Sequence, residues 1–286
     1  MKIGIDSYCF HRFFGEVYDG QEHPEKMWSM DDFLETAKKL GVDGVSLESC
    51  FFPSFEESYL AELKAKLDAY GFERVYAWGH PSGLERGQNQ ELFDDLCASI
   101  PRAKLIGAEV MRVCGSSGAF VHEPHQPQIE ALIAQFREAM KIADQVGVKL
   151  AMENHQDYNA DEMLQIVEGV NHPNFGVTFD TGNLIRVLDD PNSAVEKLAK
   201  YTMATHIKDV LVNPEAKAND WFFFSSTPAG YGLVDMMKVA KTLKQVDYQG
   251  LFAIEIDFPH PNWTGFEEEM VSMSVKKLRN IKKAIW

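Results

Sequence analysis

The chain alternates between strand-like and helix-like segments from one end to the other. Short apolar runs of strand length occur eight times, at residues 2–7, 44–48, 74–79, 109–115, 148–155, 175–180, 203–208 and 252–257. Each run is followed by a segment with apolar residues at positions i, i+3, i+4 and i+7, as in an amphipathic helix. These helical segments cover residues 30–40, 59–69, 92–105, 129–146, 160–170, 193–200, 234–243 and 266–285.

Eight consecutive strand–helix pairs predict an α/β protein with a single (β/α)8 barrel, the TIM-barrel fold, as one domain over residues 1–286. Glycines stand where four predicted helices end, at Gly41, Gly71, Gly107 and Gly147. The alternative is an open, doubly wound sheet. That fold usually has a glycine-rich dinucleotide loop after its first strand, whereas Asp6-Ser7-Tyr8 stands there in this chain.

The composition is that of a soluble globular protein, with 45% hydrophobic and 25% charged residues. The net charge of −15 disfavours nucleic acid and anionic membrane surfaces as partners. No stretch approaches the roughly 20 apolar residues of a membrane span. The aromatic run at residues 221–224 is predicted either to cover a pocket or to form a contact between subunits. A homo-oligomer is therefore one possible state of the protein.

The cysteines predict a cytoplasmic location. Cys9, Cys50, Cys97 and Cys114 are scattered and form no Cys-x-x-Cys pair, which favours reduced thiols over a disulfide framework. The first residues reach the acidic Asp6 too early for the apolar core of a signal peptide, and they are predicted to form the first strand.

Four predicted strands in the second half of the chain carry a metal-ligand side chain at or near their end. These side chains are Glu153, Asp180, His206 and Glu255. Parallel strands of a barrel all end at the same rim, so the four side chains are expected to converge. Three carboxylates and an imidazole at one point would repel one another unless a divalent cation lay between them. We therefore predict one metal ion there, with Mn²⁺ favoured and Mg²⁺, Co²⁺ or Zn²⁺ as alternatives.

The residues around these ligands form recognisable motifs. The motifs are residues 151–155 (AMENH), 178–183 (TFDTGN), 205–209 (THIKD), 253–255 (AIE), 111–113 (MRV) and 228–235 (PAGYGLVD). Together they resemble the xylose-isomerase-like TIM barrels, a superfamily that includes sugar phosphate isomerases and epimerases. The resemblance covers the whole chain and implies a metal held by Glu153, Asp180, His206 and Glu255.

The resemblance also implies a reaction on a small carbohydrate. In the ketose epimerases of this superfamily, two metal-bound glutamates lie on opposite faces of the substrate, and Glu153 and Glu255 match them. One removes a proton alpha to a carbonyl and the other returns it, while the metal stabilises the enediolate. The predicted function is therefore a metal-dependent isomerase or epimerase of a sugar or sugar derivative, with these two glutamates as catalytic residues.

His155 supports an alternative reaction. It lies two residues after Glu153, and the pair resembles the Glu-x-His of superfamily members that eliminate from keto substrates. With His155 as a catalytic base, the protein would be a lyase or dehydratase of a keto sugar, keto-glycoside or keto-cyclitol. A third hypothesis is a non-catalytic protein that binds metal or sugar.

Six further residues are candidates for substrate contacts: Arg112, Lys208, His80, Trp78, Tyr8 and Asn183. Arg112 and Lys208 would either bind an anionic or polyhydroxylated substrate or neutralise the carboxylates. Some family positions differ from the ketose 3-epimerases, which have histidine at the place of Asn183, an acidic residue at that of Asn159 and arginine at that of Val212. These differences argue against a free ketohexose as the substrate.

Overall fold

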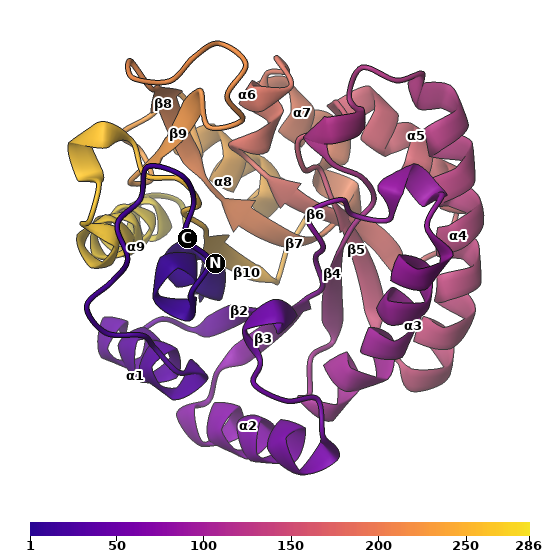
Figure 1. Ribbon diagram of the computed structural model, residues 1–286, viewed down its shortest axis with the longest axis horizontal. Coiled ribbons are helices and arrows are strands. Elements are labelled where there is room, and N and C mark those ends of the chain that lie inside the picture. Colours follow the sequence, from indigo (N-terminus) through magenta and orange to yellow (C-terminus); the bar gives the residue numbers. More distant parts are fainter.

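The computed structural model describes residues 1–286, and its central feature is a closed parallel barrel (Figure 1). The barrel strands are β1 (Lys2–Asp6), β2 (Gly44–Glu48), β3 (Glu73–Ala77), β4 (Val110–Cys114), β5 (Lys149–Glu153), β6 (Phe175–Asp180), β7 (Thr202–Ile207) and β10 (Leu251–Ile254). Each strand pairs with its neighbours in chain order, and β10 closes the ring against β1. The predicted single TIM barrel is confirmed.

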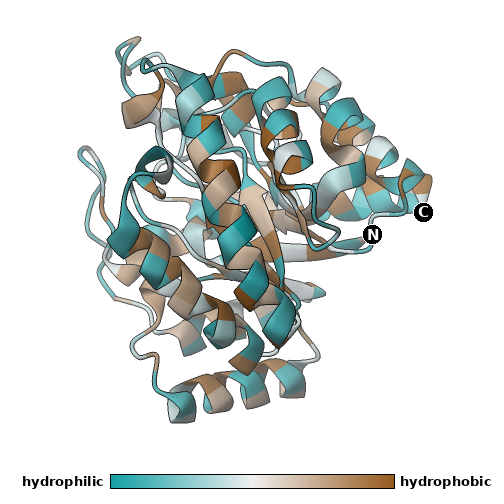
Figure 2. Ribbon diagram, turned by 90° about the vertical axis from the view of Figure 1, so that its right-hand side faces the viewer, coloured by the Kyte–Doolittle hydropathy of each residue, from teal (hydrophilic) through white to brown (hydrophobic).

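Helices form a layer around the barrel. They are α1 (Met30–Leu40), α2 (Glu57–Tyr70), α3 (Gln90–Leu105), α4 (His125–Val146), α5 (Ala160–Val170), α7 (Pro191–Leu198), α8 (Met236–Gln245) and α9 (Glu267–Ile285). Hydrophobic and hydrophilic residues alternate along these helices (Figure 2), as expected when one face packs on the strands and the other meets solvent. No helix combines the length and apolarity that crossing a membrane would require.

Several strands end earlier than the sequence predicts. β5 ends at Glu153 instead of residue 155, and β10 ends at Ile254 instead of residue 257. The reason lies in the neighbouring strand: β10 pairs with β7 only through Ala253 and Ile254, and β7 itself ends at Ile207. Beyond Ile254, the N–H of Glu255 still donates to the carbonyl of Ile207 at 3.3 Å, and β7 ends there. His155, Glu255 and Asp257 therefore lie on rim loops instead of on strands.

Two elements at the rim were not predicted. A short helix, α6 (Asn183–Arg186), follows β6, and an antiparallel hairpin of β8 (Asp209–Val212) and β9 (Phe224–Thr227) follows β7. The helix and each strand of the hairpin are four residues long, which is too short to show a hydrophobic period. The hairpin stands above the barrel in Figure 1. It contacts the segment after β10 through a bridge between Ser226 and Pro259.

Short 3-10 turns complete the loops. They comprise Ser7–Phe14, Ser49–Phe51, Glu85–Gly87, Gly118–Phe120, Ala199–Tyr201 and Pro261–Trp263. The aromatic run of the hairpin packs on the loop after β1, since the rings of Trp221 and Tyr18 lie 5.0 Å apart. The rings of Phe222 and Phe258 stack at 4.2 Å. The loops after β1, β7 and β10 thus contact one another at the carboxyl end of the barrel.

Candidate metal centre

Four buried side chains converge at the carboxyl end of the barrel. Glu153 ends β5, Asp180 ends β6, His206 lies near the end of β7 and Glu255 directly follows β10. One ligand atom from each lies within 4.8 Å of those of the other three, and none of the four side chains is more than 5% exposed. The structure thus brings together the four residues that the strand ends predict as metal ligands.

The imidazole of His206 lies at the middle of this cluster. Its Nδ1 atom is 3.0 Å from Glu255 and 3.2 Å from Glu153. Its Nε2 atom faces the carboxylate of Asp6, at 3.4 Å. Asp6 is itself held by the backbone N–H of Tyr8, which donates to it at 2.6 Å. The Asp6 carboxylate thus lies on the far side of the ring, and Nδ1 faces Glu153 and Glu255, as the nitrogen of a metal ligand would.

The charges of the cluster fit a divalent cation. Two buried carboxylate oxygens, Asp180 Oδ2 and Glu255 Oε2, receive no hydrogen bond. Burial alone would lower the pKa of His206, but Glu255 and Glu153 raise it well above its usual value. These two oxygens contact the Lys208 ammonium at 3.1 and 3.0 Å but accept no hydrogen bond, so each keeps lone pairs that a metal ion could use. Hard oxygen donors with one nitrogen are suited to Mn²⁺, Mg²⁺, Co²⁺ or Zn²⁺.

Glu153 is restrained on both of its oxygens. Arg112 on β4 forms a hydrogen-bonded ion pair with Oε2, and the side-chain amide of Asn183 donates to Oε1 at 3.2 Å. Arg112 also lies 3.5 Å from Glu48 and donates to the carbonyl of Trp78 at 3.2 Å. Arg112 and Asn183 were both predicted to contact the substrate. The structure favours the neutralising interpretation of Arg112 and gives Asn183 an orienting position beside Glu153.

Lys208 is also occupied by carboxylates. Its ammonium group lies 3.1 Å from Asp180, 3.0 Å from Glu255 and 3.1 Å from Asp257, and its side chain is 2% exposed. Burial alone would lower the pKa of Lys208, but the three carboxylates raise it well above its usual value, so the amine carries a charge. The structure thus supports charge neutralisation by Lys208 over contact with an anionic substrate.

Asp257 and Arg186 complete the site, and neither was a candidate. Arg186 on α6 donates two hydrogen bonds to Asp257, at 2.5 and 2.9 Å, and both side chains are buried. Asp257 lies two residues after Glu255, just as His155 lies two after Glu153 and Lys208 two after His206, so the same spacing also indicates Asp257. No comparable signal marks Arg186, because its partner lies 71 residues away.

The Nδ1 atom of His155 is buried and has no hydrogen-bond partner. Burial lowers the pKa of His155 to about 4. The imidazole is therefore neutral near pH 7 and can accept a proton. Its position two residues beyond Glu153 is compatible with the predicted role as a base.

The remaining candidates are not equally placed. Trp78 is 2% exposed, and its indole N–H donates to Asp95 on α3 at 2.8 Å, so the ring packs toward the helix layer. This position argues against the predicted contact of Trp78 with the substrate. The hydroxyl of Tyr8 donates to Glu16 at 2.8 Å. His80 lies on an exposed turn and accepts from the N–H of Ser82 at 3.2 Å. Substrate contact stays a prediction for Tyr8 and His80.

Comparisons with known proteins agree with this fold. The chain is 25% identical over 246 residues to a 3-oxo-isoapionate decarboxylase from Pectobacterium atrosepticum, covering 85% of this chain and 81% of that protein. It is 25% identical over 242 residues to an L-ribulose-5-phosphate 3-epimerase from Escherichia coli, covering 78% of this chain and 80% of the relative.

Solved structures with lower sequence identity share the architecture. A xylose isomerase domain protein from Planctomyces limnophilus superposes with a TM-score of 0.76 at 22% identity, over 99% of this chain and 98% of that one. An IOLI protein with a bound zinc atom superposes with a TM-score of 0.75 at 16% identity, over 100% and 99% of the two chains. The family model described as xylose isomerase-like TIM barrel matches residues 34–279. The chain therefore belongs to the xylose isomerase-like TIM-barrel family.

Proposed function

We propose that this protein is a divalent-metal-dependent isomerase or epimerase that acts on a sugar or sugar derivative. The observation that carries the proposal is the arrangement of Glu153, Asp180, His206 and Glu255, four buried ligand groups within 4.8 Å of one another at the carboxyl end of a TIM barrel. Active sites of this fold lie at that end. The relative named as a ribulose-phosphate 3-epimerase supports a carbohydrate substrate.

In the proposed reaction, a C–H bond next to a carbonyl breaks and its electron pair moves toward the carbonyl oxygen. A divalent ion would supply positive charge where this oxygen becomes negative, with Mn²⁺ favoured and Zn²⁺ supported by the zinc-containing structural relative. Glu153 and Glu255 flank His206, at 3.2 and 3.0 Å from its Nδ1 atom. One carboxylate takes the proton and the other returns one to the carbon from the opposite face.

A lyase or dehydratase is the second candidate, and the free imidazole of His155 favours it. Both oxygens of Glu153 already accept hydrogen bonds, whereas Nδ1 of His155 has no partner. The imidazole is neutral near pH 7 and can accept a proton, although a pKa of about 4 makes it a weaker base than an ordinary histidine. With His155 as the base, the same enediolate would expel a leaving group from the next carbon.

Incubation in D₂O with Mn²⁺ separates these reactions. An isomerase or epimerase should place one deuterium at the alpha carbon and leave the mass otherwise unchanged, whereas a lyase product should lack water or another leaving group. The substrates would be ketoses, keto-glycosides and keto-cyclitols, followed by mass spectrometry and NMR.

Variants then assign the base. At Mn²⁺ concentrations that restore the metal content, Glu153→Gln and Glu255→Gln should each slow exchange by at least about 100-fold if the two glutamates transfer the proton. His155→Asn should have that effect if the reaction is an elimination. Glu138→Gln, on the exposed face of α4, is the matched control. The absence of both exchange and elimination with every substrate would contradict both candidate functions.

A further inference from the structure

We propose that the substrate is an uncharged keto sugar that bears an uncharged, partly apolar substituent, and that this substituent lies in a cavity beside the metal cluster. The cavity is bordered by the loops after β4 and β5, by α6 and by the β8–β9 hairpin, and its volume is about 760 Å³. The inference rests on the proposed function, because it names the substrate class of the same site.

The first argument is that every cation near the cluster is already neutralised. Arg112 pairs with Glu153 and Glu48, Lys208 contacts three carboxylates, and Arg186 holds Asp257 through two hydrogen bonds. A substrate phosphate or carboxylate away from the metal would be buried without a free positive side chain, or would break one of these pairs. Either outcome is costly, since an unpaired buried charge is strongly unfavourable.

The second argument is the position of the cavity. Gln156 and Asp157, which line it, come directly after His155 in the chain. On the other side, Arg186 lines the cavity and donates to Asn183 at 3.1 Å, and Asn183 donates to Glu153 at 3.2 Å. A sugar whose reacting carbon lies between Glu153 and His155 would thus have an adjacent space for a substituent. The volume lies in the upper part of the 300–1,000 Å³ range typical of ligand sites.

The chemistry of the lining selects the kind of substituent. Arg186 is the only lysine or arginine among the lining residues, and Asp257 neutralises it. Glu162 and Asp220 add carboxylates, which disfavour an anionic group. Trp221, Phe223, Phe224, Val187 and Leu188 supply apolar surface, which suits an aryl or alkyl group.

Leu188 is the most informative of these residues. Its side chain is 87% exposed, and its backbone has φ of 59°, in the left-handed region that a leucine rarely adopts. An exposed, strained leucine does not contribute to the packed core. Its place at the edge of the cavity is explained if it contacts an apolar part of the ligand.

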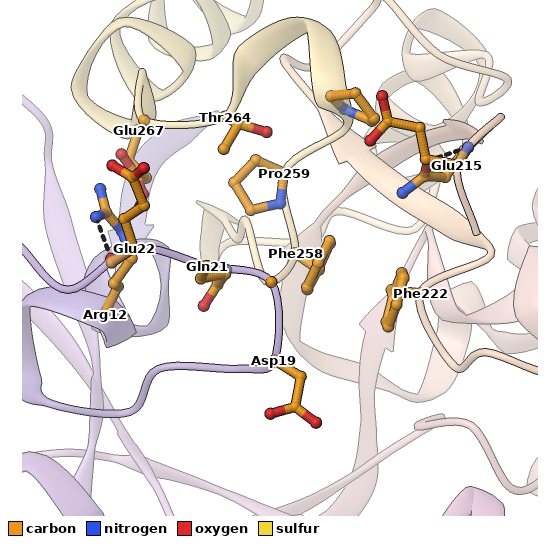
Figure 3. A pocket seen from close by; sticks show the side chains of 14 residues that line it. Arg12, Asp19, Gln21, Glu22, Glu215, Phe222, Phe258, Pro259, Thr264 and Glu267 are labelled. Carbon is orange, nitrogen blue, oxygen red and sulfur yellow. Dashed lines mark hydrogen bonds and ion pairs between the residues drawn. The ribbon is translucent and has the colours of Figure 1, made fainter.

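A second cavity, of about 430 Å³, provides no alternative site for a phosphate (Figure 3). Arg12 is its only lysine or arginine, and this side chain donates to Glu267 at 2.8 Å and to the carbonyl of Glu22 at 2.6 Å. Asp19 and Glu215 add further negative charge. Both cavities therefore lack a free cation.

Three matched probes test the inference: methyl β-glucoside, phenyl β-glucoside and methyl β-glucoside 6-phosphate. Binding to the Mn²⁺-loaded protein is measured by calorimetry, and deuterium exchange is measured with the corresponding 3-keto compounds. We expect the phenyl compound to bind about 10- to 100-fold more tightly than the methyl compound, from burial of the ring. The phosphate should bind at least about 100-fold more weakly than its parent.

Tighter binding of the phosphate, or equal affinity for phenyl and methyl glucosides, would overturn the inference. Because binding is measured with unreactive glucosides, this result is independent of turnover. The expected binding order without exchange of any keto compound would overturn the proposed function and leave the substrate class standing.

A single substitution locates the subsite. Asparagine tolerates the left-handed backbone, so Leu188→Asn should fold while removing the apolar contact. The ratio of phenyl to methyl affinity should fall about 3- to 10-fold. Leu105→Asn, at an exposed leucine that ends α3, should leave the ratio unchanged. An unchanged ratio in Leu188→Asn would show that the substituent does not lie in this cavity.

Discussion

The carboxylate of Asp209 accepts hydrogen bonds from four backbone N–H groups. The donors are Val210, Gly230, Gly232 and Val234, at 3.1, 2.8, 2.9 and 3.0 Å. Asp209 begins the rim hairpin just after Lys208, and the glycines belong to the PAGYGLVD motif. A Cβ atom on Gly232 would lie 2.3 Å from Asp209 Oδ1, so the turn can approach this carboxylate only with glycine there. The PAGYGLVD motif is thus explained by the hydrogen bonds from its backbone to Asp209, which fix the loop that follows the hairpin.

We expect Gly232→Ala to destabilise the protein by about 1–3 kcal/mol, because the added methyl group must displace Asp209 or the turn. Gly118→Ala is the control, since its Cβ atom would meet nothing closer than 3.5 Å. Urea denaturation would compare the two variants. Equal stability of both would contradict this account of the turn.

Asp157 is a buried carboxyl group whose only hydrogen-bond partners are backbone N–H groups. Ser116 donates to it at 3.1 Å and Tyr158 at 2.8 Å. Burial raises the pKa of Asp157 from 3.8 to about 7, although these hydrogen bonds oppose the shift. The folded state therefore binds a proton that the unfolded state has already lost between about pH 4 and pH 7. The stability that this proton contributes is present below pH 4 and is lost as the pH rises through about 7.

Asp157→Asn removes this titration. The free energy of unfolding of the variant, relative to the wild type, should rise by about 1–3 kcal/mol between pH 5 and pH 8. The asparagine amide also has one hydrogen-bond acceptor fewer than the carboxyl group. This loss changes the free energy of unfolding by the same amount at pH 5 and pH 8, so the predicted pH dependence is unaffected. Urea denaturation at the two pH values measures the change, and a difference that does not depend on pH would contradict the prediction.

Helix α5 begins at a complete capping box next to the metal site. The side chain of Asn159 accepts from the N–H groups of Asp161 and Glu162, at 3.0 and 3.1 Å, and Glu162 accepts from the N–H of Asn159 at 3.0 Å. Asn159 occupies the position at which the ketose 3-epimerases of the superfamily have an acidic residue. In this chain the position starts the helix that follows the loop containing His155.

Asn159→Ala should cost about 1 kcal/mol of stability, because two N–H groups lose their acceptor. Asn159→Ser should stay close to the wild type, since serine is an equally good N-cap. The midpoints of urea denaturation would show the difference. Similar midpoints for the alanine and serine variants would mean that the cap does not stabilise the fold.

Binding of a metal at the end of the barrel would link β5, β6, β7 and the segment after β10. A ligand that binds only the folded protein stabilises it, by about 2.7 kcal/mol at 100 times its dissociation constant. For a chain of this size, we expect Mn²⁺ at that excess to raise the melting temperature by about 5–10 °C.

All four ligands are needed to hold the metal. Glu153→Gln should therefore abolish most of the rise in melting temperature and lower the metal content after dialysis. Glu138→Gln, on the exposed side of α4, should keep both the rise in melting temperature and the metal content of the wild type. Differential scanning calorimetry with and without a chelator measures the effect. A full rise in the Glu153→Gln variant would refute the proposed site.

The sequence alone determined the order of the elements and the four ligand positions, because both follow from local patterns. Apolar periodicity marks strands and helices, and parallel strands must end at one rim, so Glu153, Asp180, His206 and Glu255 were predictable. Asp257 was within reach of the same reasoning. The rim hairpin and α6 were not, because four-residue elements carry no period.

Only the tertiary structure decided which charges are paired and which groups are free. Arg186 meets Asp257 across 71 residues, and Arg112 meets Glu153 across 41. Trp78 packs outward onto Asp95, whereas His155 keeps an unpartnered nitrogen. The physical reason is that a side chain's partner depends on which neighbouring loops and helices pack against it, and that packing depends on contacts far apart in the chain.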